Sequence, residues 1–305
     1  MNQLIASDAA TACGLLRTGT QFDLVYLDPP YSVGSAMTAR HQKGQSRGRQ
    51  RPESGPVAYI DSGDVEALLD MLTKSLVAIA ERMSPDGALY LHMDWRAVHE
   101  AKVVADRVFG RRCYCGDITW TPGNGSRGAR GFSVTHQTIL VYAKGGRRKL
   151  RFRSDHPLLR ESYAETSLRM HFRHTDEDGR RYRERTVGGK TYRYYADEGR
   201  RLGSVWTDIS AMVANTPLMK ESTGYPTQKP ERLLERIIRA SSEPGACVAD
   251  LMCGSGTTLA VAARLDRQFV GADRSPKAIE IARARLGAAG VDYAFVTPAQ
   301  ATGTE

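Results

Sequence analysis

Short apolar runs alternate along the chain with stretches in which apolar residues recur every three or four positions. Residues 21–27 (QFDLVYL) are typical of the first pattern, because they are rich in β-forming residues and end at two prolines. Such runs predict buried strands at residues 21–27, 88–93, 115–120, 138–142, 247–250 and 268–272.

The second pattern predicts amphipathic helices between these strands. Leu68, Leu72, Leu76, Ile79 and Met83 recur at helical spacing and define the first helix. Further helices are predicted from Val98, Ala101, Ala105 and Val108, from Leu233, Leu234, Ile237 and Ile238 with Pro230 in the first turn, and over residues 257–265 and 276–286. Alternating strands and helices predict an α/β fold, a doubly wound and mostly parallel Rossmann-like sheet that binds ligands at the carboxyl ends of its strands.

One segment breaks this alternation. In residues 147–203 basic residues interleave with phenylalanine and tyrosine without a long apolar period, so we interpret the segment as an inserted domain. It divides a larger domain into residues 1–146 and 204–290, and a C-terminal tail follows at residues 291–305. A mobile loop is predicted at about residues 36–60, because their centre is rich in Gly, Arg, Gln and Ser.

Positive charge is concentrated in two places. The net charge of the chain is +9 at pH 7. Residues 147–201 contain 16 lysines and arginines against 9 acidic residues, a net charge of +7, and residues 40–51 contain five basic residues and no acidic residue. The rest of the chain therefore carries −3. Basic attachments on a neutral-to-acidic core are typical of a protein that binds a polyanion.

The chain gives no signal for a membrane, for secretion or for a metal. No apolar run approaches the roughly 20 residues that span a bilayer, and residues 1–10 lack the features of a secretion signal. We therefore expect a cytoplasmic protein without a membrane partner. The five cysteines show no paired Cys-x-x-Cys spacing, so neither a zinc site nor a redox dithiol is predicted.

A glycine turn lies between a predicted strand and a predicted helix near the carboxyl end. Residues 254–256 (GSG) allow a ligand to approach the backbone closely. Asp273 follows Asp250 by 23 residues at the end of the next strand, where an acid can accept both ribose hydroxyls of an adenosine. NAD would fit that spacing too, but Leu259 takes the place of the third glycine of the dinucleotide fingerprint. A tight turn without a ligand is the remaining alternative.

The strand predicted at residues 21–27 ends in Asp28, Pro29, Pro30 and Tyr31. An exocyclic base amine is a poor nucleophile, because its lone pair is delocalised into the ring. The Asp28 carboxylate and the Pro29 carbonyl can each accept one of its N–H bonds and steer the lone pair toward a methyl donor. Tyr31 offers a ring face for a base taken out of the duplex, and the prolines stiffen the backbone.

Three motifs, in this order, give the chain a resemblance to a known family. Residues 28–31 (DPPY), 225–230 (YPTQKP) and 253–258 (CGSGTT) are similar to motifs of the β group of amino-methylating DNA methyltransferases. Shorter segments at residues 7–8, 89–95, 136–142 and 205–209 also resemble that family, in its order. The resemblance covers nearly the whole chain except the basic insertion. It implies an enzyme that transfers a methyl group directly from S-adenosylmethionine to a base amine of double-stranded DNA.

The resemblance also implies a role for each matching residue. The target base would be held by Asp28, Pro29, Pro30 and Tyr31. The cofactor site would comprise Asp8 near the adenine end, Asp273 at the ribose, Thr227 and Lys229 at the carboxylate, Asp250, Cys253, Gly254, Gly256 and Thr257 at the methionine part, and Met252 and Ser255 beside them. The insertion would be the target recognition domain, whose arginines and lysines neutralise phosphates.

Some features leave alternatives open. The family usually has Asp-Pro-Phe where this chain has Asp250, Leu251 and Met252, which predicts a weakened affinity for the cofactor. It also motivates a second class, a DNA-binding protein that has kept the fold and lost the chemistry. Asp at position 28 favours adenine N6 over cytosine N4 as the methylated atom, since Ser is commoner in the cytosine enzymes. Cytosine C5 methylation is not expected, because no Pro-Cys pair is present. Family members are often homodimers and can have a cognate restriction enzyme, so both are candidate partners.

Overall fold

The computed structural model describes residues 2–31, 36–38, 57–60, 63–123, 131–212 and 221–298, with backbone alone for 36–38 and 57–60. Contacts divide the chain into two compact units. The first unit is Met1–Arg151 together with Val205–Glu305, and the second is Phe152–Ser204. Each unit is described by itself below.

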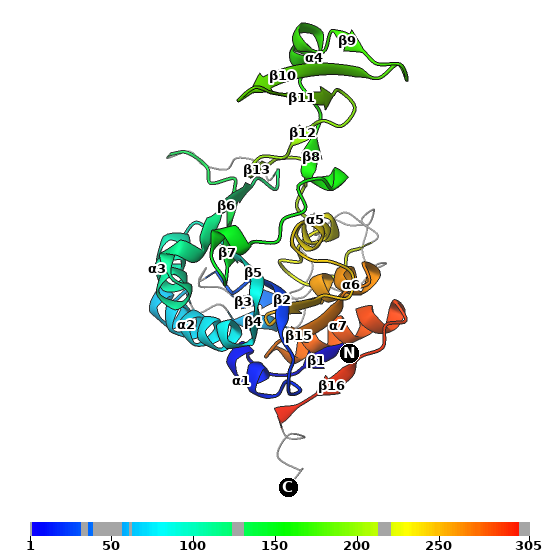
Figure 1. Ribbon diagram of the computed structural model, residues 1–305. Coiled ribbons are helices and arrows are strands. Elements are labelled where there is room, and N and C mark those ends of the chain that lie inside the picture. The colour runs from blue at the N-terminus through cyan, green and yellow to red at the C-terminus, as the bar shows by residue number, and fades with distance from the viewer. Residues whose placement is uncertain are drawn as a thin grey trace, which may run out of the picture. The chain divides into compact units, whose positions relative to one another are not determined.

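A mixed sheet forms the centre of the first unit (Figure 1). Among the described residues it has nine strands, in the order β13-β6-β7-β5-β2-β14-β15-β1-β16. Their bounds are β1 Gln3–Ile5, β2 Phe22–Leu27, β5 Met83–Met93, β6 Tyr114–Trp120, β7 Gln137–Ala143, β13 Val205–Trp206, β14 Cys247–Asp250, β15 Gln268–Ala272 and β16 Ala294–Val296. Only β7 runs against its neighbours β5 and β6, and the other neighbours pair in parallel.

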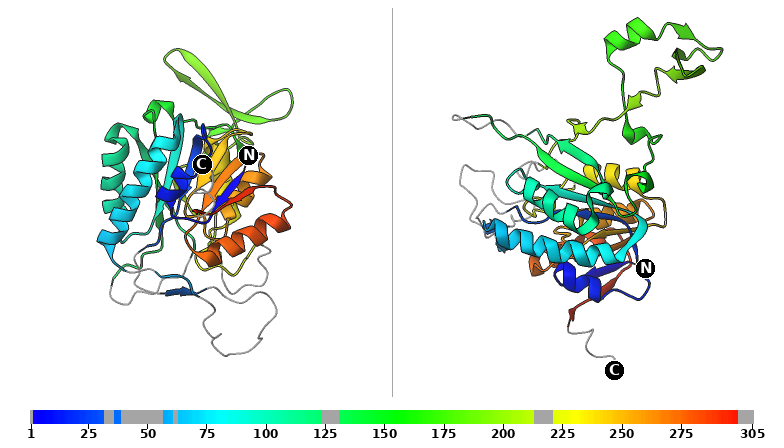
Figure 2. Two further views of the ribbon diagram at one scale, coloured as in Figure 1. Left: turned by 90° about the horizontal axis from the view of Figure 1, so that it is seen from below. Right: turned by 60° about the vertical axis from the view of Figure 1, so that its left-hand side comes forward.

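Helices cover both faces of this sheet, as the two views of Figure 2 show. Helices α1 (Ala9–Gly14), α2 (Val65–Arg82) and α3 (Val98–Phe109) pack side by side on one face. Helices α5 (Glu231–Ser241), α6 (Thr257–Arg264) and α7 (Pro276–Ala288) do so on the other. The sequence prediction of a doubly wound, mostly parallel Rossmann-like α/β fold is confirmed.

Local sequence explains where these helices begin and which face they bury. Asp64 caps α2 by accepting the backbone N–H of Ala67 at 3.1 Å. Ser275 caps α7 in the same way, 3.3 Å from the N–H of Ala278, and Pro276 follows at the first helical position. The apolar stripe of α2 is buried against the sheet at Leu68, Leu72, Leu76 and Ile79. Burial of each such side chain stabilises the fold by roughly 1.5 to 3 kcal/mol.

Several boundaries differ from the prediction. Met83 belongs to β5 and not to the preceding helix, and Pro230 is the N-cap of α5 and not a residue of its first turn. Short strands at Gln3–Ile5 and Ala294–Val296 were not predicted, and the latter lies within the segment interpreted as a tail. Three-residue strands are too short to show a period of their own, and they form because β15 and β1 offer free edges.

The remaining elements are short. Strands β3 (Ala36–Thr38) and β4 (Val57–Ile60) pair antiparallel at the two ends of the predicted loop at about residues 36–60, whose centre lies outside the described residues. Turns of 3-10 helix occur at η1 (Arg111–Cys113) and η2 (Arg147–Lys149). Within the described part of the chain, no helix has the length and apolar character needed to span a bilayer.

The second unit is built on a β-hairpin. Strands β10 (Arg181–Val187) and β11 (Lys190–Tyr195) pair antiparallel, and β9 (His174–Thr175) adds to the edge of β10. Strands β8 (Arg160–Glu161) and β12 (Arg200–Arg201) form a second ribbon, accompanied by η3 (Pro157–Leu159) and α4 (Glu165–His171). Leu159 and Phe172 are its buried apolar residues. The role predicted for residues 147–203, target recognition, stays a prediction.

Candidate active site

Two loops far apart in the sequence meet at the carboxyl edge of the central sheet. Strands β2 and β14 are direct neighbours and run parallel, with Leu24 opposite Val248 and Val25 opposite Ala249. Asp28 follows the end of β2, and the glycine turn at residues 254–256 follows β14. Because parallel neighbours end at the same edge, the acidic loop and the glycine turn are brought side by side.

A cavity of about 460 Å³ lies between these loops. Ligand sites of this kind typically measure roughly 300 to 1,000 Å³. Of the residues predicted for the site, those lining the cavity are Asp8, Asp28, Pro29, Pro30, Tyr31, Thr227, Lys229, Asp250, Met252, Cys253, Gly254, Ser255, Thr257 and Asp273. Gly256 is the predicted site residue that does not line it.

The two glycines of the turn have different tasks. Gly254 has a φ of +49°, and a Cβ placed there would lie 3.0 Å from Cε1 of the Tyr225 ring, inside the cavity wall. Gly256 has a φ of +70° and is the N-cap of α6, where a Cβ would lie 3.0 Å from Cβ of Ala282 in α7. A Cβ at Gly256 would meet the neighbouring helix, so this glycine has a packing role, and its predicted contact with the cofactor stays a prediction.

Asp273 fastens the glycine turn to the next strand. Its Oδ2 accepts the N–H of Gly254 at 2.9 Å, and its Oδ1 accepts the N–H of Ser275 at 2.8 Å. Burial raises the pKa of this carboxyl above its usual range. Each carboxylate oxygen has two acceptor positions, so Asp273 can still accept hydroxyl groups of a ligand while it holds the turn.

Asp250 is a buried carboxyl at the tip of β14, with an exposed fraction of 3%. It accepts hydrogen bonds from the Thr258 hydroxyl and, at 3.2 Å, from the N–H of Met252. Burial raises the pKa of Asp250 to about 7, and the negative charges of Asp28 and Asp273 act in the same direction. A positively charged group bound in the cavity would favour its ionised form.

Asp28 has two partners inside the cavity. The Tyr31 hydroxyl donates to its Oδ1, and the Lys229 ammonium pairs with its Oδ2. The Lys229 side chain is 8% exposed, and its Nζ lies 5.1 Å from the centre of the Tyr31 ring. Lys229 neutralises Asp28, a largely buried acid, and its predicted contact with a carboxylate of the cofactor stays a prediction.

Behind Asp28 lies a buried polar chain that the sequence analysis missed. The Tyr26 hydroxyl is 2.7 Å from Nδ1 of His92, whose Nε2 is 2.8 Å from Oε1 of Gln137. Gln137 accepts through Oε1, so His92 donates from Nε2 and accepts from Tyr26 at Nδ1. Burial lowers the pKa of His92 to about 3, and the charge of Lys229 acts in the same direction. The one signal in the sequence was a histidine inside the apolar run at residues 88–93.

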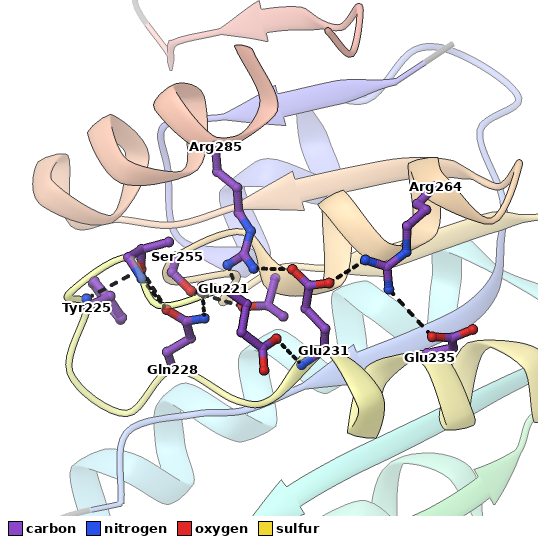
Figure 3. A network of polar contacts seen from close by, with 10 residues as sticks. Glu221, Tyr225, Gln228, Glu231, Glu235, Ser255, Arg264 and Arg285 are labelled. Atoms are coloured by element: carbon purple, nitrogen blue, oxygen red, sulfur yellow. Dashed lines mark hydrogen bonds and ion pairs between the residues drawn. The ribbon is translucent and has the colours of Figure 1, made fainter. Parts of the chain in front are cut away.

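A third loop, residues 221–230, also lines the cavity and is held in place by Gln228 (Figure 3). The Gln228 side chain accepts from the N–H and hydroxyl of Thr223, at 3.0 and 2.7 Å, and donates to the Glu221 carbonyl at 2.7 Å. Thr227 has a φ of 62°, which is costly for a β-branched residue. Such strain of roughly 1 to 3 kcal/mol persists only where surrounding contacts impose it.

An ion-pair network connects the start of α5, directly after this loop, to helices α6 and α7. Glu231 binds Arg285 of α7 at 2.7 Å and also pairs with Arg264 of α6, as Figure 3 shows. Arg285 in turn donates to the Thr257 hydroxyl at 2.9 Å. The first turn of α6 and the start of α5 are therefore fixed relative to each other. Sequence periodicity gave no sign of this, since the partners come from three separate helices.

Helix α2 contributes a wall that the sequence analysis also missed. Ala67, Asp70, Met71, Lys74 and Ser75 line the cavity. They lie beside the apolar stripe of α2, one or two residues before or after its buried leucines. An amphipathic period locates the buried stripe, but it does not tell which of the flanking residues meet a cavity.

The residues that are present fit S-adenosylmethionine, the cofactor implied by the resemblance. Asp8, Asp250 and Asp273 supply three carboxylates along the wall, which suits a ligand with hydroxyl groups and positive charge. The missing side chain at Gly254 leaves room for close approach of a ligand to the backbone. Met252, in the place of the family's usual phenylalanine, is half-buried, and Leu251 is buried in the core; both line the cavity.

Known proteins share both the sequence pattern and the fold. The model of a family described as DNA methylase matches residues 22–284. Type II methyltransferase M.EcaI of Enterobacter cloacae is 27% identical over 315 residues, covering 90% of this chain and 67% of that protein. TTHA0409 of Thermus thermophilus has the same fold, with a TM-score of 0.57, 18% identity and coverage of 97% of this chain and 99% of its own. So does the cytosine-N4-specific PvuII DNA methyltransferase, with a TM-score of 0.55, 14% identity and coverage of 93% and 86%.

Proposed function

This chain belongs to the DNA methylase family, which methylates N6 of adenine or N4 of cytosine with S-adenosylmethionine, and we propose that this member acts on adenine. The observation that supports methyl transfer is the shared cavity, which brings the Asp28 loop and the glycine turn together, and the choice of adenine rests on the residue at position 28. A methyl donor and a base amine can meet only if both bind in one pocket.

The base amine is proposed to bind at residues 28–31. A carboxylate offers about four acceptor positions, so Asp28 can keep Tyr31 and Lys229 and still accept an N–H of the amine. The Pro29 carbonyl would accept the second N–H, which leaves the nitrogen lone pair directed out of the ring plane. The base has to leave the duplex to reach this buried position, and the Tyr31 ring would stack on it.

The cofactor is proposed to bind along the glycine turn. When bound, S-adenosylmethionine supplies an electrophilic methyl group. Asp273 would accept the ribose hydroxyls, and Asp8 would lie at the adenine end. Asp250, Cys253 and Met252 would line the methionine part, and Asp250 in its ionised form would stabilise positive charge there. Thr227 would reach the carboxylate end of the ligand, beside the backbone that Gln228 fixes.

The residue at position 28 favours adenine over cytosine as the substrate. Aspartate heads the tetrapeptide here, as is commoner among adenine-N6 members of the family, whereas serine is commoner among cytosine-N4 members. DNA recognition is assigned to the unit Phe152–Ser204, whose sequence is rich in arginine and tyrosine. The substrate proposal therefore depends on the first unit, and the choice of DNA site on the second.

The test is to identify the modified nucleoside. Purified protein is incubated with genomic DNA and methyl-labelled S-adenosylmethionine, and the DNA is digested to nucleosides and separated by chromatography with mass spectrometry. We expect the label in N6-methyladenine. Label in N4-methylcytosine would contradict the choice of adenine, while the assignment as a DNA methyltransferase would still hold. DNA binding without any transfer of label would support a non-catalytic DNA-binding protein instead.

A further inference from the structure

The hairpin of the second unit has a fixed register, which decides which side chains share a face. Gly188 and Gly189 form its two-residue turn with φ values of 57° and 78°, as a type I′ turn requires. The register pairs Arg185 with Tyr192 and Val187 with Lys190. Directly opposed residues point to the same side of a ribbon, so each side chain is assigned to one of two faces.

One side, which we call the paired face, consists of Tyr182, Glu184, Thr186, Thr191, Arg193 and Tyr195. Its charges are satisfied within the unit. Arg193 binds Glu184 at 3.0 Å and lies 4.0 Å from the centre of the Tyr182 ring. Arg180, just before β10, binds Asp197 at 2.9 Å and lies 3.9 Å from the centre of the Tyr195 ring.

The other side, the basic face, consists of Arg181, Arg183, Arg185, Val187, Lys190, Tyr192 and Tyr194. It carries four basic residues and no acidic residue. The two arginines far from the turn serve the fold. Arg181 donates to the Leu168 carbonyl of α4 at 2.8 Å, and the Arg183 guanidinium lies 5.3 Å from the centre of the Phe172 ring.

Near the turn, the Lys190 ammonium lies 5.4 Å from the centre of the Tyr192 ring, and both side chains are exposed. Within Phe152–Ser204, all of which is described, Arg185 and Lys190 are exposed and form no ion pair with a carboxylate. Apolar surface accompanies them on the same face. Val187 is 52% exposed and Tyr192 is 42% exposed, whereas the tyrosines of the paired face are half-buried.

Resting on the proposed function, we infer that the turn-proximal half of the basic face is the surface that contacts duplex DNA. Arg185 and Lys190 neutralise phosphates, and Tyr192 and Val187 pack against sugar and base edges. A two-stranded ribbon has the dimensions that enter the major groove. Arg180 and Arg193 belong to the same hairpin region, but their charges are already paired, so they do not contribute.

The test measures how DNA affinity depends on salt. Full-length protein is titrated with a fluorescent duplex at about 0.05 to 0.3 M salt, and the logarithm of affinity is plotted against that of salt concentration. Each phosphate contact adds about 0.9 to the slope. We expect Arg185→Gln and Lys190→Gln each to reduce the slope by about 0.9, and to weaken binding about fivefold at about 0.15 M salt. The double variant should have a slope reduced by about 1.8.

Two controls change charge on the paired face of the same hairpin. Arg193→Gln removes one positive charge and Glu184→Gln removes one negative charge, and neither should change the slope. If Arg193→Gln reduced the salt slope as much as Arg185→Gln does, at unchanged thermal stability, the assignment of the face would be overturned. A steeper slope with Glu184→Gln would overturn it as well.

The outcome also separates this inference from the proposed function. Wild-type protein that binds no duplex and transfers no label refutes both. If the wild-type protein methylates DNA but the Arg185→Gln/Lys190→Gln variant keeps the same salt slope, only the assignment of the DNA-contacting face is refuted. Calorimetry with S-adenosylmethionine checks that each variant keeps its cofactor affinity, as expected for changes confined to the second unit.

Discussion

At the scale of single residues, Asp28 has a structural role besides the chemical role proposed for it. It holds the Tyr31 hydroxyl and compensates the charge of Lys229, whose side chain is only 8% exposed. Removing one member of a buried pair leaves the other charge without compensation, which costs about 3 to 5 kcal/mol. A loss of activity at Asp28 therefore has to be separated from a loss of folding.

A double variant makes that separation. Asp28→Ala should abolish methyl transfer and lower the free energy of unfolding by about 3 kcal/mol, because Lys229 loses its partner. Asp28→Ala/Lys229→Met should recover much of that stability and stay inactive. Urea unfolding and label transfer measure the two quantities, and calorimetry should show cofactor affinity largely retained in Asp28→Ala. Recovery of activity in the double variant would mean that Asp28 acts only by neutralising Lys229.

Asp250 gives the molecule a defined pH dependence. Its pKa is about 7 in the folded state and near the ordinary value of 3.8 in the unfolded chain. Between these two values the folded state binds the proton that the unfolded state has lost. Its contribution to stability therefore falls as pH rises from about 4 to about 7, and it is constant outside that window. Neutral His92, with a pKa of about 3, has the opposite slope between about 3 and 6.5.

The variant Asp250→Asn isolates the first effect. The free energy of unfolding of the variant minus that of wild type should increase as pH rises from about 4 to about 7, by at most about 4 kcal/mol. Urea denaturation at a series of pH values measures the difference between the two proteins, which cancels His92 and other groups. Parallel pH curves for wild type and variant would contradict the raised pKa.

At the scale of elements, the glycine turn does two separate jobs within three residues. Gly254 shapes the cavity beside the Tyr225 ring, and Gly256 lets α6 pack on α7 at Ala282. Both glycines have positive φ values, so both resist substitution. Substitution should have different consequences at the two positions, because Gly254 lines the cavity and Gly256 does not.

Alanine at each position tests this division. Gly256→Ala should lower the free energy of unfolding by about 1 to 3 kcal/mol, since the new Cβ strains the backbone and meets Ala282. The affinity of the folded protein for S-adenosylmethionine should change little. Gly254→Ala should weaken cofactor binding at least tenfold, or by about 1.4 kcal/mol. Calorimetry and urea unfolding are needed for each variant, and equal loss of affinity in both would refute the separate roles.

At the scale of the whole molecule, the cavity and the hairpin with the basic face belong to different units. The cavity and its loops lie in Met1–Arg151 and Val205–Glu305, whereas Phe152–Ser204 has its own small core at Leu159 and Phe172. A unit with its own core can be removed without opening the core of the other. Cofactor binding and DNA binding should therefore be separable.

Deletion of the second unit tests this separation. Replacing residues 152–204 with a flexible Gly/Ser linker should keep the affinity for S-adenosylmethionine within about twofold, a change of only about 0.4 kcal/mol. Affinity for duplex DNA should fall, and its salt dependence should flatten because phosphate contacts are lost. Loss of cofactor binding in a folded deletion variant would show that the first unit depends on the second.

The sequence by itself determined the strand and helix alternation, the fold class and the two motifs of the cavity. Apolar periodicity depends on near neighbours, and the motif residues 28–31 and 254–256 are contiguous, so both can be read along the chain. Tertiary structure alone decided that β2 and β14 are neighbours, that Lys229 pairs with Asp28, and that Gly256 meets Ala282. These contacts join residues from separate elements, and no local pattern encodes which distant partner folding brings to a given side chain.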